Sequence, residues 1–205
     1  MENQFIYSKN VIEFVTVVAE TCLFLEHSRE NSKEEFVIKA VKLLPLLYLK
    51  TSLINAGAID SDEAPERFVT EEDYLFVKEQ IESLLGTDDG FLETFHPDMQ
   101  YSDTPIAAFI SENLADIYQE LKDFAANYQI GETDIMESAL KDCMESFAEH
   151  WGQKLLNALR ALHALRYSDT FGDAEEDEHF NAEEYRKIDR NSFLRFQNTN
   201  NDDEI

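Results

Sequence analysis

The fold is decided by residues 104–131, which read TPIAAFISENLADIYQELKDFAANYQIG. Apolar side chains recur there at steps of three and four residues from Ile106 to Tyr128, which is the spacing of one face of an α-helix. A Thr-Pro pair at the beginning and Gly131 at the end are typical helix boundaries. We therefore predict one amphipathic helix, whose apolar face must be buried against other helices.

The same period recurs on both sides of this stretch. Further helices are predicted over residues 10–27, 32–55, 70–85 and 133–165. Ser32 with Glu35 forms a capping box at the second helix, and Thr70 caps the third. Because proline lacks an amide N–H, Pro45 is expected to kink the second helix or to divide it.

No alternation of apolar and polar residues typical of a strand is found, and acidic loops are expected at residues 55–70 and 87–103. The fold class predicted for residues 1–167 is a single all-α bundle of five or six helices. Residues 168–205 hold twelve acids and four bases, a balance that predicts an acidic tail that is largely disordered or loosely docked. Such a tail is a candidate for partner binding.

The chain has 43 Asp and Glu against 17 Lys and Arg, a formal net charge of −26. This charge excludes most nucleic-acid binding and disfavours anionic membranes, because both require clustered bases. The longest uncharged apolar run, residues 43–49, is too short for the roughly 20 residues of a membrane span. Two cysteines 121 positions apart and the lack of a signal sequence predict a cytoplasmic protein. We expect a basic protein partner, and homo-oligomers remain possible.

Sequence signatures of catalysis are missing, and no cofactor or metal is expected. The best alternative is a metal-dependent hydrolase of a phosphorylated small molecule, which would use Asp116, Glu112 and Glu149. Glu112, Asp116, Glu120 and Asp123 form a stripe on one helix, but the angles along this helix place it away from the apolar seam. A solvated face is therefore favoured, and the main prediction is a non-enzymatic binding or adaptor protein.

The final helix has a second group of candidate binding residues. Lys154 falls near its apolar seam and His150 at the edge of the seam, so Lys154 must pair with a carboxylate, extend to solvent or face a cavity. Gly152 beside them permits the close approach of another backbone or of a ligand. Trp151, one turn from Phe147, is predicted to lie in the core.

Two segments of the chain resemble a bacterial protein family, domain of unknown function 5063. They read ENLADIYQELK at residues 112–122 and FAEHWG at residues 147–152, the second followed by ALRALH at residues 158–163. The resemblance covers about residues 8–167 and leaves the tail outside.

The resemblance implies a cytosolic bacterial protein of about this length, and it carries over no activity or catalytic residue. It draws attention to Asp116, Tyr118, His150 and Trp151, the polar and aromatic members of the two segments. The residues predicted for ligand or partner binding are His150, Lys154, Asp116 and Tyr118.

Overall fold

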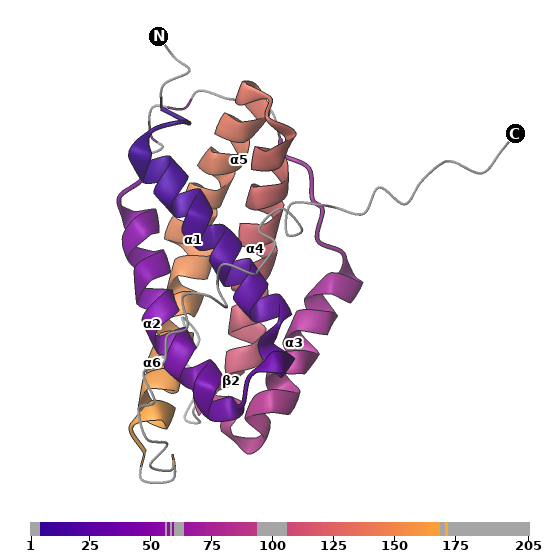
Figure 1. Cartoon of the computed structure of the whole chain (residues 1–205), viewed down its shortest axis with the longest axis vertical. Helices are drawn as coiled ribbons and strands as arrows, with labels where there is room; N and C mark the ends of the chain where they lie inside the picture. Colours follow the sequence, from indigo (N-terminus) through magenta and orange to yellow (C-terminus); the bar gives the residue numbers. More distant parts are fainter. Residues whose placement is uncertain are drawn as a thin grey trace, which may run out of the picture. The chain divides into compact units, whose positions relative to one another are not determined.

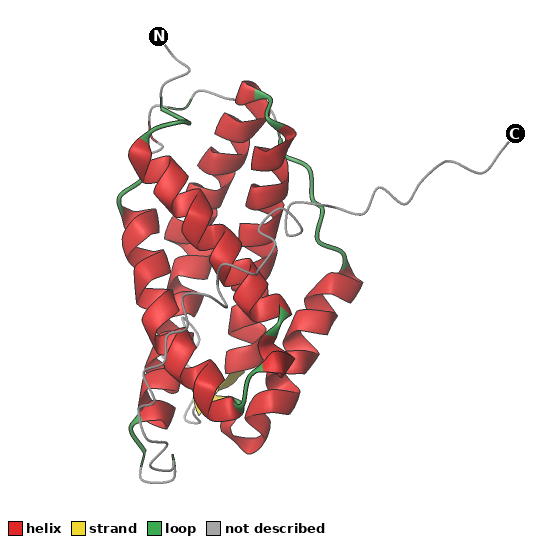
Figure 2. Cartoon of the chain, viewed as in Figure 1, coloured by secondary structure: helices red, strands yellow, loops and turns green. Residues whose placement is uncertain are grey.

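The computed structural model describes residues 5–55, 57, 59, 64–93, 106–168 and 171. This part of the chain is mainly helical, as Figure 2 shows, and confirms the all-α fold class. The α-helices are α1 (Lys9–Glu26), α2 (Lys33–Ser52), α3 (Glu71–Leu85), α4 (Ile110–Ile130), α5 (Thr133–Ser146) and α6 (Gly152–Arg166). Two short strands, β1 (Gly90–Leu92) and β2 (Ala107–Phe109), accompany them.

The helix that decides the fold lies at the centre of the bundle. α4 packs against α1, α3, α5 and α6, and α2 packs against α1 and α6 (Figure 1). The apolar seam of α4 is fully buried, from Ile110 and Leu114 to Leu121. α2 and α3 lie on opposite sides of α1, at the two edges of the view.

The helix caps that were predicted from neighbouring residues are present in the structure. Ser32 with Glu35 and Thr70 with Asp73 form reciprocal capping boxes at the starts of α2 and α3. Gly131 ends α4 with a φ of 80°, a left-handed conformation that glycine adopts without steric cost. α5 begins at Thr133, and its cap position is held by Glu132, whose side chain makes no capping hydrogen bond.

The predicted start of the central helix is wrong. Ala107–Phe109 forms β2, which pairs antiparallel with β1, so α4 begins only at Ile110. The cap comes from a distant residue, because the buried Asp89 carboxylate accepts hydrogen bonds of 2.7 Å from both the amide and the hydroxyl of Ser111. The strands also correct the expectation of a loop over residues 87–103, of which residues 94–103 lie outside the described part of the chain.

Two further helices differ from their predicted form. α2 is not divided at Pro45, whose side chain is exposed, and it ends at Ser52 rather than near residue 55. The predicted final helix consists of α5, a π-helical turn at Phe147–Trp151 and α6. A π turn places one extra residue in the helix, so side chains beyond it are rotated relative to a regular helical wheel.

Trp151 lies fully buried at the end of this π turn, which confirms its prediction as a core residue. Its indole Nε1 donates a 3.0 Å hydrogen bond to the carbonyl oxygen of Cys143, and its ring packs on Phe147 with centroids 4.6 Å apart. The turn depends on Gly152, because a Cβ there would overlap the carbonyl oxygen of Phe147 and lie 2.9 and 3.0 Å from its ring. The close approach expected at Gly152 is to the backbone of its own helix.

Candidate functional site

The acidic stripe of α4 connects α4 to other elements of the bundle. At its first position, the Glu112 carboxylate is 3.1 Å from the ammonium of Lys78 on α3. Exposure then falls along the stripe, and the last carboxylate, Asp123, is buried. The expectation of a solvated face is therefore wrong, because other elements pack on this side of the central helix as well.

Asp116 is the centre of a three-residue cluster in the middle of the stripe. Its carboxylate pairs with the ammonium of Lys154 on α6 and accepts a 3.0 Å hydrogen bond from the hydroxyl of Tyr74 on α3. Burial and the charge of Asp116 raise the pKa of the Tyr74 phenol, so it remains a donor at neutral pH. The prediction that Lys154 pairs with a carboxylate is confirmed. One cluster thus holds α3, α4 and α6 together.

Tyr118 belongs to a different cluster on the side of α1. Its hydroxyl donates a 2.8 Å hydrogen bond to Glu26 Oε1, and the ammonium of Lys122 is 2.7 Å from the same oxygen. Burial and the Glu26 charge raise the pKa of Tyr118. Of the four predicted binding residues, the structure thus brings only Asp116 and Lys154 together, whereas His150 is exposed on the π turn.

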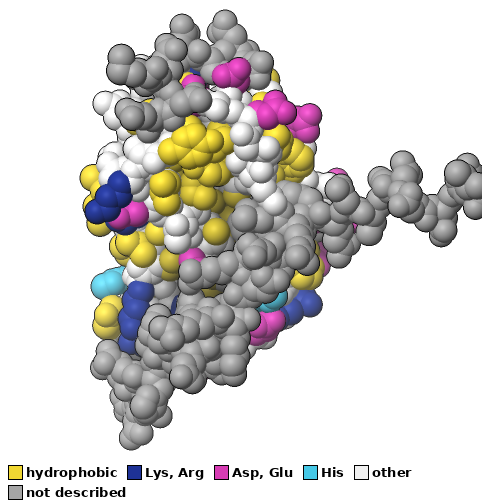
Figure 3. Space-filling model, turned by 45° about the horizontal axis from the view of Figure 1, so that its top comes forward, with side chains coloured by type: hydrophobic (Ala, Val, Ile, Leu, Met, Phe, Trp, Pro, Cys, Tyr) yellow, Lys and Arg dark blue, Asp and Glu magenta, His cyan; other side chains and the backbone are white. Residues whose placement is uncertain are grey.

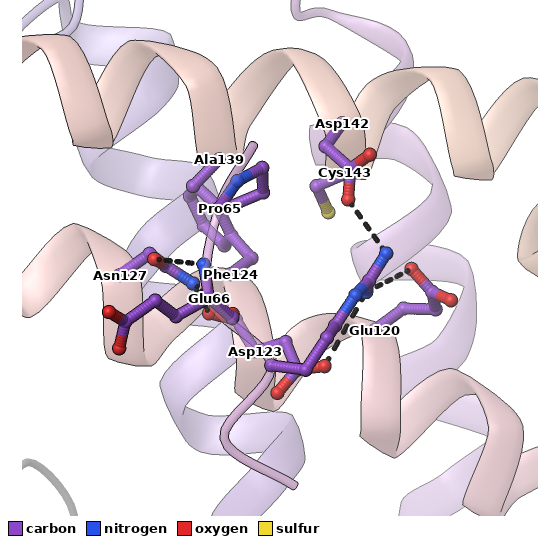
Figure 4. A pocket seen from close by; sticks show the side chains of 10 residues that line it. Pro65, Glu66, Glu120, Asp123, Phe124, Asn127, Ala139, Asp142 and Cys143 are labelled. Carbon is purple, nitrogen blue, oxygen red and sulfur yellow. Dashed lines mark hydrogen bonds and ion pairs between the residues drawn. The ribbon is translucent and has the colours of Figure 1, made fainter. Parts of the chain in front are cut away.

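Arg67 closes the far end of the acidic stripe. Its guanidinium lies 3.4 Å from Asp123 and 3.7 Å from Glu120 on α4, and 3.1 Å from Asp142 on α5 (Figure 4). Although burial lowers its pKa, the charges of these three carboxylates outweigh that effect and raise it. A hollow beside the guanidinium has a free volume of about 10 Å³, which is room for about one water molecule. It is too small for a substrate.

Residues 64–70 are also held on α4 by hydrogen bonds between their backbone groups and two α4 side chains. The Asp123 carboxylate accepts 2.7 and 2.9 Å bonds from the amides of Phe68 and Val69. The side-chain amide of Asn127 both accepts from the amide and donates to the carbonyl of Glu66. The role of Asp123 and Asn127 is therefore to fix the segment that leads into α3.

The residues of the predicted hydrolase site do not meet. Glu112 and Asp116 are each paired with a lysine, and Glu149 is exposed on the π turn. Within the described residues, no three His, Cys, Asp or Glu side chains are placed to hold a metal ion. Cys22 and Cys143 are both buried, and burial raises the pKa of each thiol well above its usual value.

The side of α3 that faces away from the bundle carries a second acidic stripe, which the sequence analysis did not single out. It consists of Glu72, Leu75, Glu79 and Glu82 at steps of three and four, with Phe76 beside it, and we call it the α3 outer stripe. Leu75 is 39% and Phe76 53% exposed, and all three glutamates are exposed. A signal was present in the sequence, since these residues share one helical face opposite the buried Val77 and Ile81.

Comparisons with known proteins identify relatives of this bundle. The model of the family described as domain of unknown function (DUF5063) matches residues 5–168. A solved structure, protein BF1032 from Bacteroides fragilis, is similar with 45% sequence identity and a TM-score of 0.72. The similarity covers 80% of this chain and 97% of that one. No curated protein matches the chain.

Proposed function

The chain belongs to the DUF5063 family, and we propose that it is a non-enzymatic binding protein of the cytoplasm whose partner is both basic and apolar. The α3 outer stripe carries this proposal. Two large apolar side chains are exposed there among glutamates, a combination that suits an amphipathic segment with lysine or arginine beside its apolar face. None of the helices in the described part of the chain combines the length and the apolar content that crossing a bilayer requires.

The charge balance of α3 supports a basic partner. The helix contains five acids and a single base, Lys78. The ammonium of Lys78 is 3.1 Å from Glu112 on α4, and its hydrogen bond to this carboxylate raises its pKa. Lys78, the single base of α3, thus forms its ion pair within the bundle, whereas Glu72 and Glu79 face away from it. Complementary charge would speed association and select against acidic competitors.

The inner side of α3 holds the outer stripe in a fixed orientation. Tyr74 and Lys78, one helical turn apart, bind Asp116 and Glu112, which are also one turn apart on α4. Asp116 and Lys154, predicted as binding residues, would on this proposal act indirectly by fixing α3. A surface that is ordered before binding loses less conformational entropy when the partner docks.

The acidic residues 172–205 lie outside the described part of the chain. We infer that their charge adds long-range attraction for the same basic partner, without a defined contact. A hydrolase is not proposed, because two of its three acids form ion pairs with lysines inside the bundle.

The test uses a short synthetic peptide with Lys and Leu at helical spacing as the probe, titrated into the full chain by fluorescence anisotropy. The double variant Phe76→Gln/Glu79→Lys is expected to weaken binding at least tenfold, about 1.4 kcal/mol. Ile130→Gln/Glu145→Lys is the matched control, since it changes one exposed apolar residue and one exposed acid away from α3. Binding should also weaken as salt rises.

Two results would contradict the proposal. The first is equal weakening in both double variants, which would mean that the peptide responds to total charge rather than to the α3 outer stripe. The second is a peptide affinity unchanged by either variant, which would remove the stripe as the binding surface.

A further inference from the structure

The outward side of α2 differs from every acidic surface described above. Lys42, Leu46, Leu49 and Leu53 follow one another at steps of four, three and four residues, and we call them the α2 leucine stripe. At about 100° per residue they point away from the core side of α2, which is marked by the buried Ala40, Leu44 and Leu47. Leu46, Leu49 and Leu53 are 40%, 53% and 49% exposed.

The apolar surface continues from α2 onto α1. The side-chain amide of Asn10 donates to the carbonyl oxygen of Leu53, so the start of α1 lies beside the end of the stripe. Ile12, in the first turn of α1, is also half exposed. Apolar side chains gather in a patch on the face of the molecule drawn in Figure 3, although the chain as a whole is strongly acidic.

The sequence of α2 and of the residues after it has a net charge opposite in sign to that of the whole chain. Residues 36–59 contain three lysines and no acid, in a protein with a net charge of −26. Two copies of so acidic a chain repel each other over most of their surfaces. The α2 leucine stripe is a surface where they can meet without placing carboxylate against carboxylate.

We propose that the α2 leucine stripe is the interface of a symmetric dimer, in which α2 packs antiparallel on α2 of a second copy. Apolar residues at alternating steps of three and four are the pattern by which one helix packs on another. A two-fold axis near the middle of the stripe would place Leu46 of one copy opposite Leu49 of the other. The same patch serves both copies, as two-fold symmetry requires.

The antiparallel arrangement also gives Lys42 a partner. Lys42 of one copy would lie at the carboxyl-terminal end of α2 of the other, where the helix dipole favours a cation. Glu13 is at that end, because its carboxylate is 2.7 Å from the ammonium of Lys50 in the last turn of α2. A second copy therefore covers the leucines and brings Lys42 near Glu13 with one and the same surface.

The dimer is independent of the proposed function, since α2 and α3 lie on opposite sides of α1. Sedimentation velocity over a range of protein concentrations is expected to show a change from monomer to dimer. Leu49→Glu should raise the dimer dissociation constant at least about 30-fold, the effect of losing one central interface residue. Ile130→Glu is the matched control, because Ile130 is an apolar side chain that is 44% exposed but lies on α4, outside both stripes.

Salt gives a second measurement that does not depend on any variant. Screening of the net charge of −26 should strengthen the dimer as salt rises, whereas binding of a basic peptide to α3 should weaken. A wild-type chain that stays monomeric at all concentrations would overturn the proposal. So would a dimer that survives Leu49→Glu, or one that Ile130→Glu weakens to the same degree, provided that circular dichroism shows both variants folded.

Discussion

Replacing Gly152 by alanine tests the account of the π turn, because two physical effects predict opposite signs. Gly152 has ordinary helical angles, φ −61° and ψ −40°. At such a position inside a helix, alanine is normally more stable than glycine by about 1 kcal/mol. Helix propensity alone therefore predicts that Gly152→Ala stabilises the protein.

The packing around Gly152 predicts the reverse. The added Cβ would overlap the carbonyl oxygen of Phe147, which accepts the Gly152 amide in the π turn, and would press on two ring carbons of Phe147. Because the overlapping atom belongs to the backbone, the turn itself must move, and overpacking of this kind costs about 1–3 kcal/mol or more. The buried hydrogen bond from Trp151 to Cys143 would be disturbed as well, at about 1 kcal/mol. The net expectation is a loss of about 1–3 kcal/mol.

Urea unfolding followed by the fluorescence of Trp151, the single tryptophan, measures this loss. Ala164→Gly is the matched control, since Ala164 is exposed on α6 and should report helix propensity alone, as a loss of about 1 kcal/mol. If Gly152→Ala equals or exceeds the wild type in stability, the π turn does not depend on glycine and the reasoning is wrong.

Four other predictions follow from named contacts. Trp151→Ala should destabilise the fold by about 3–5 kcal/mol, measured by thermal or urea unfolding, because its ring is fully buried. Lys154→Met should lower the free energy of unfolding by about 2 kcal/mol, measured by urea unfolding. This loss lies between those typical of surface and of buried ion pairs, because Lys154 and Asp116 are both partly buried and Tyr74 still donates to Asp116. Tyr118 has a raised pKa in the folded state, so its contribution to stability is present below pH 10 and is lost as the pH rises further. Ultraviolet titration checks this, because the spectrum of Tyr118→Phe should lack one phenol that ionises late in the wild type. A chain ending at Tyr167 should keep its melting temperature, because α6 ends at Arg166 and the family match ends at residue 168; a large fall would make the tail part of the fold.

The sequence allowed the helices and their local caps to be predicted, because those signals lie within a few neighbouring residues. Ser32 with Glu35 and Thr70 with Asp73 are examples, and both capping boxes are present. The start of α4 could not be predicted in this way. Its cap is Asp89, 22 residues before Ser111, and such a partner has no fixed spacing along the chain.

The candidate site shows the same division between local and distant signals. The apolar seam indicated that Lys154 needs a carboxylate, but the identity of Asp116 depends on how α4 packs against α6. His150 was predicted at the edge of the seam but is exposed, because it lies within the π turn, whose extra residue a regular helical wheel does not contain. The acids of α4 were predicted to be solvated because a helical wheel describes one helix and not the other elements that pack on it.

The two outward stripes differ in charge, and this difference would let each of them select its own proposed partner, a basic one at α3 and a second copy at α2. Leu75 of the α3 outer stripe lies among glutamates, so the proposed basic and apolar partner would gain there from an attraction that salt weakens. The α2 leucine stripe has Lys42 at one end and no acid within residues 36–59, so the same basic partner would gain no comparable attraction there. A second copy would be repelled at α3 by like charge and, as proposed, would bind at α2 through apolar contact. Opposite responses to salt would therefore identify which stripe a given complex uses.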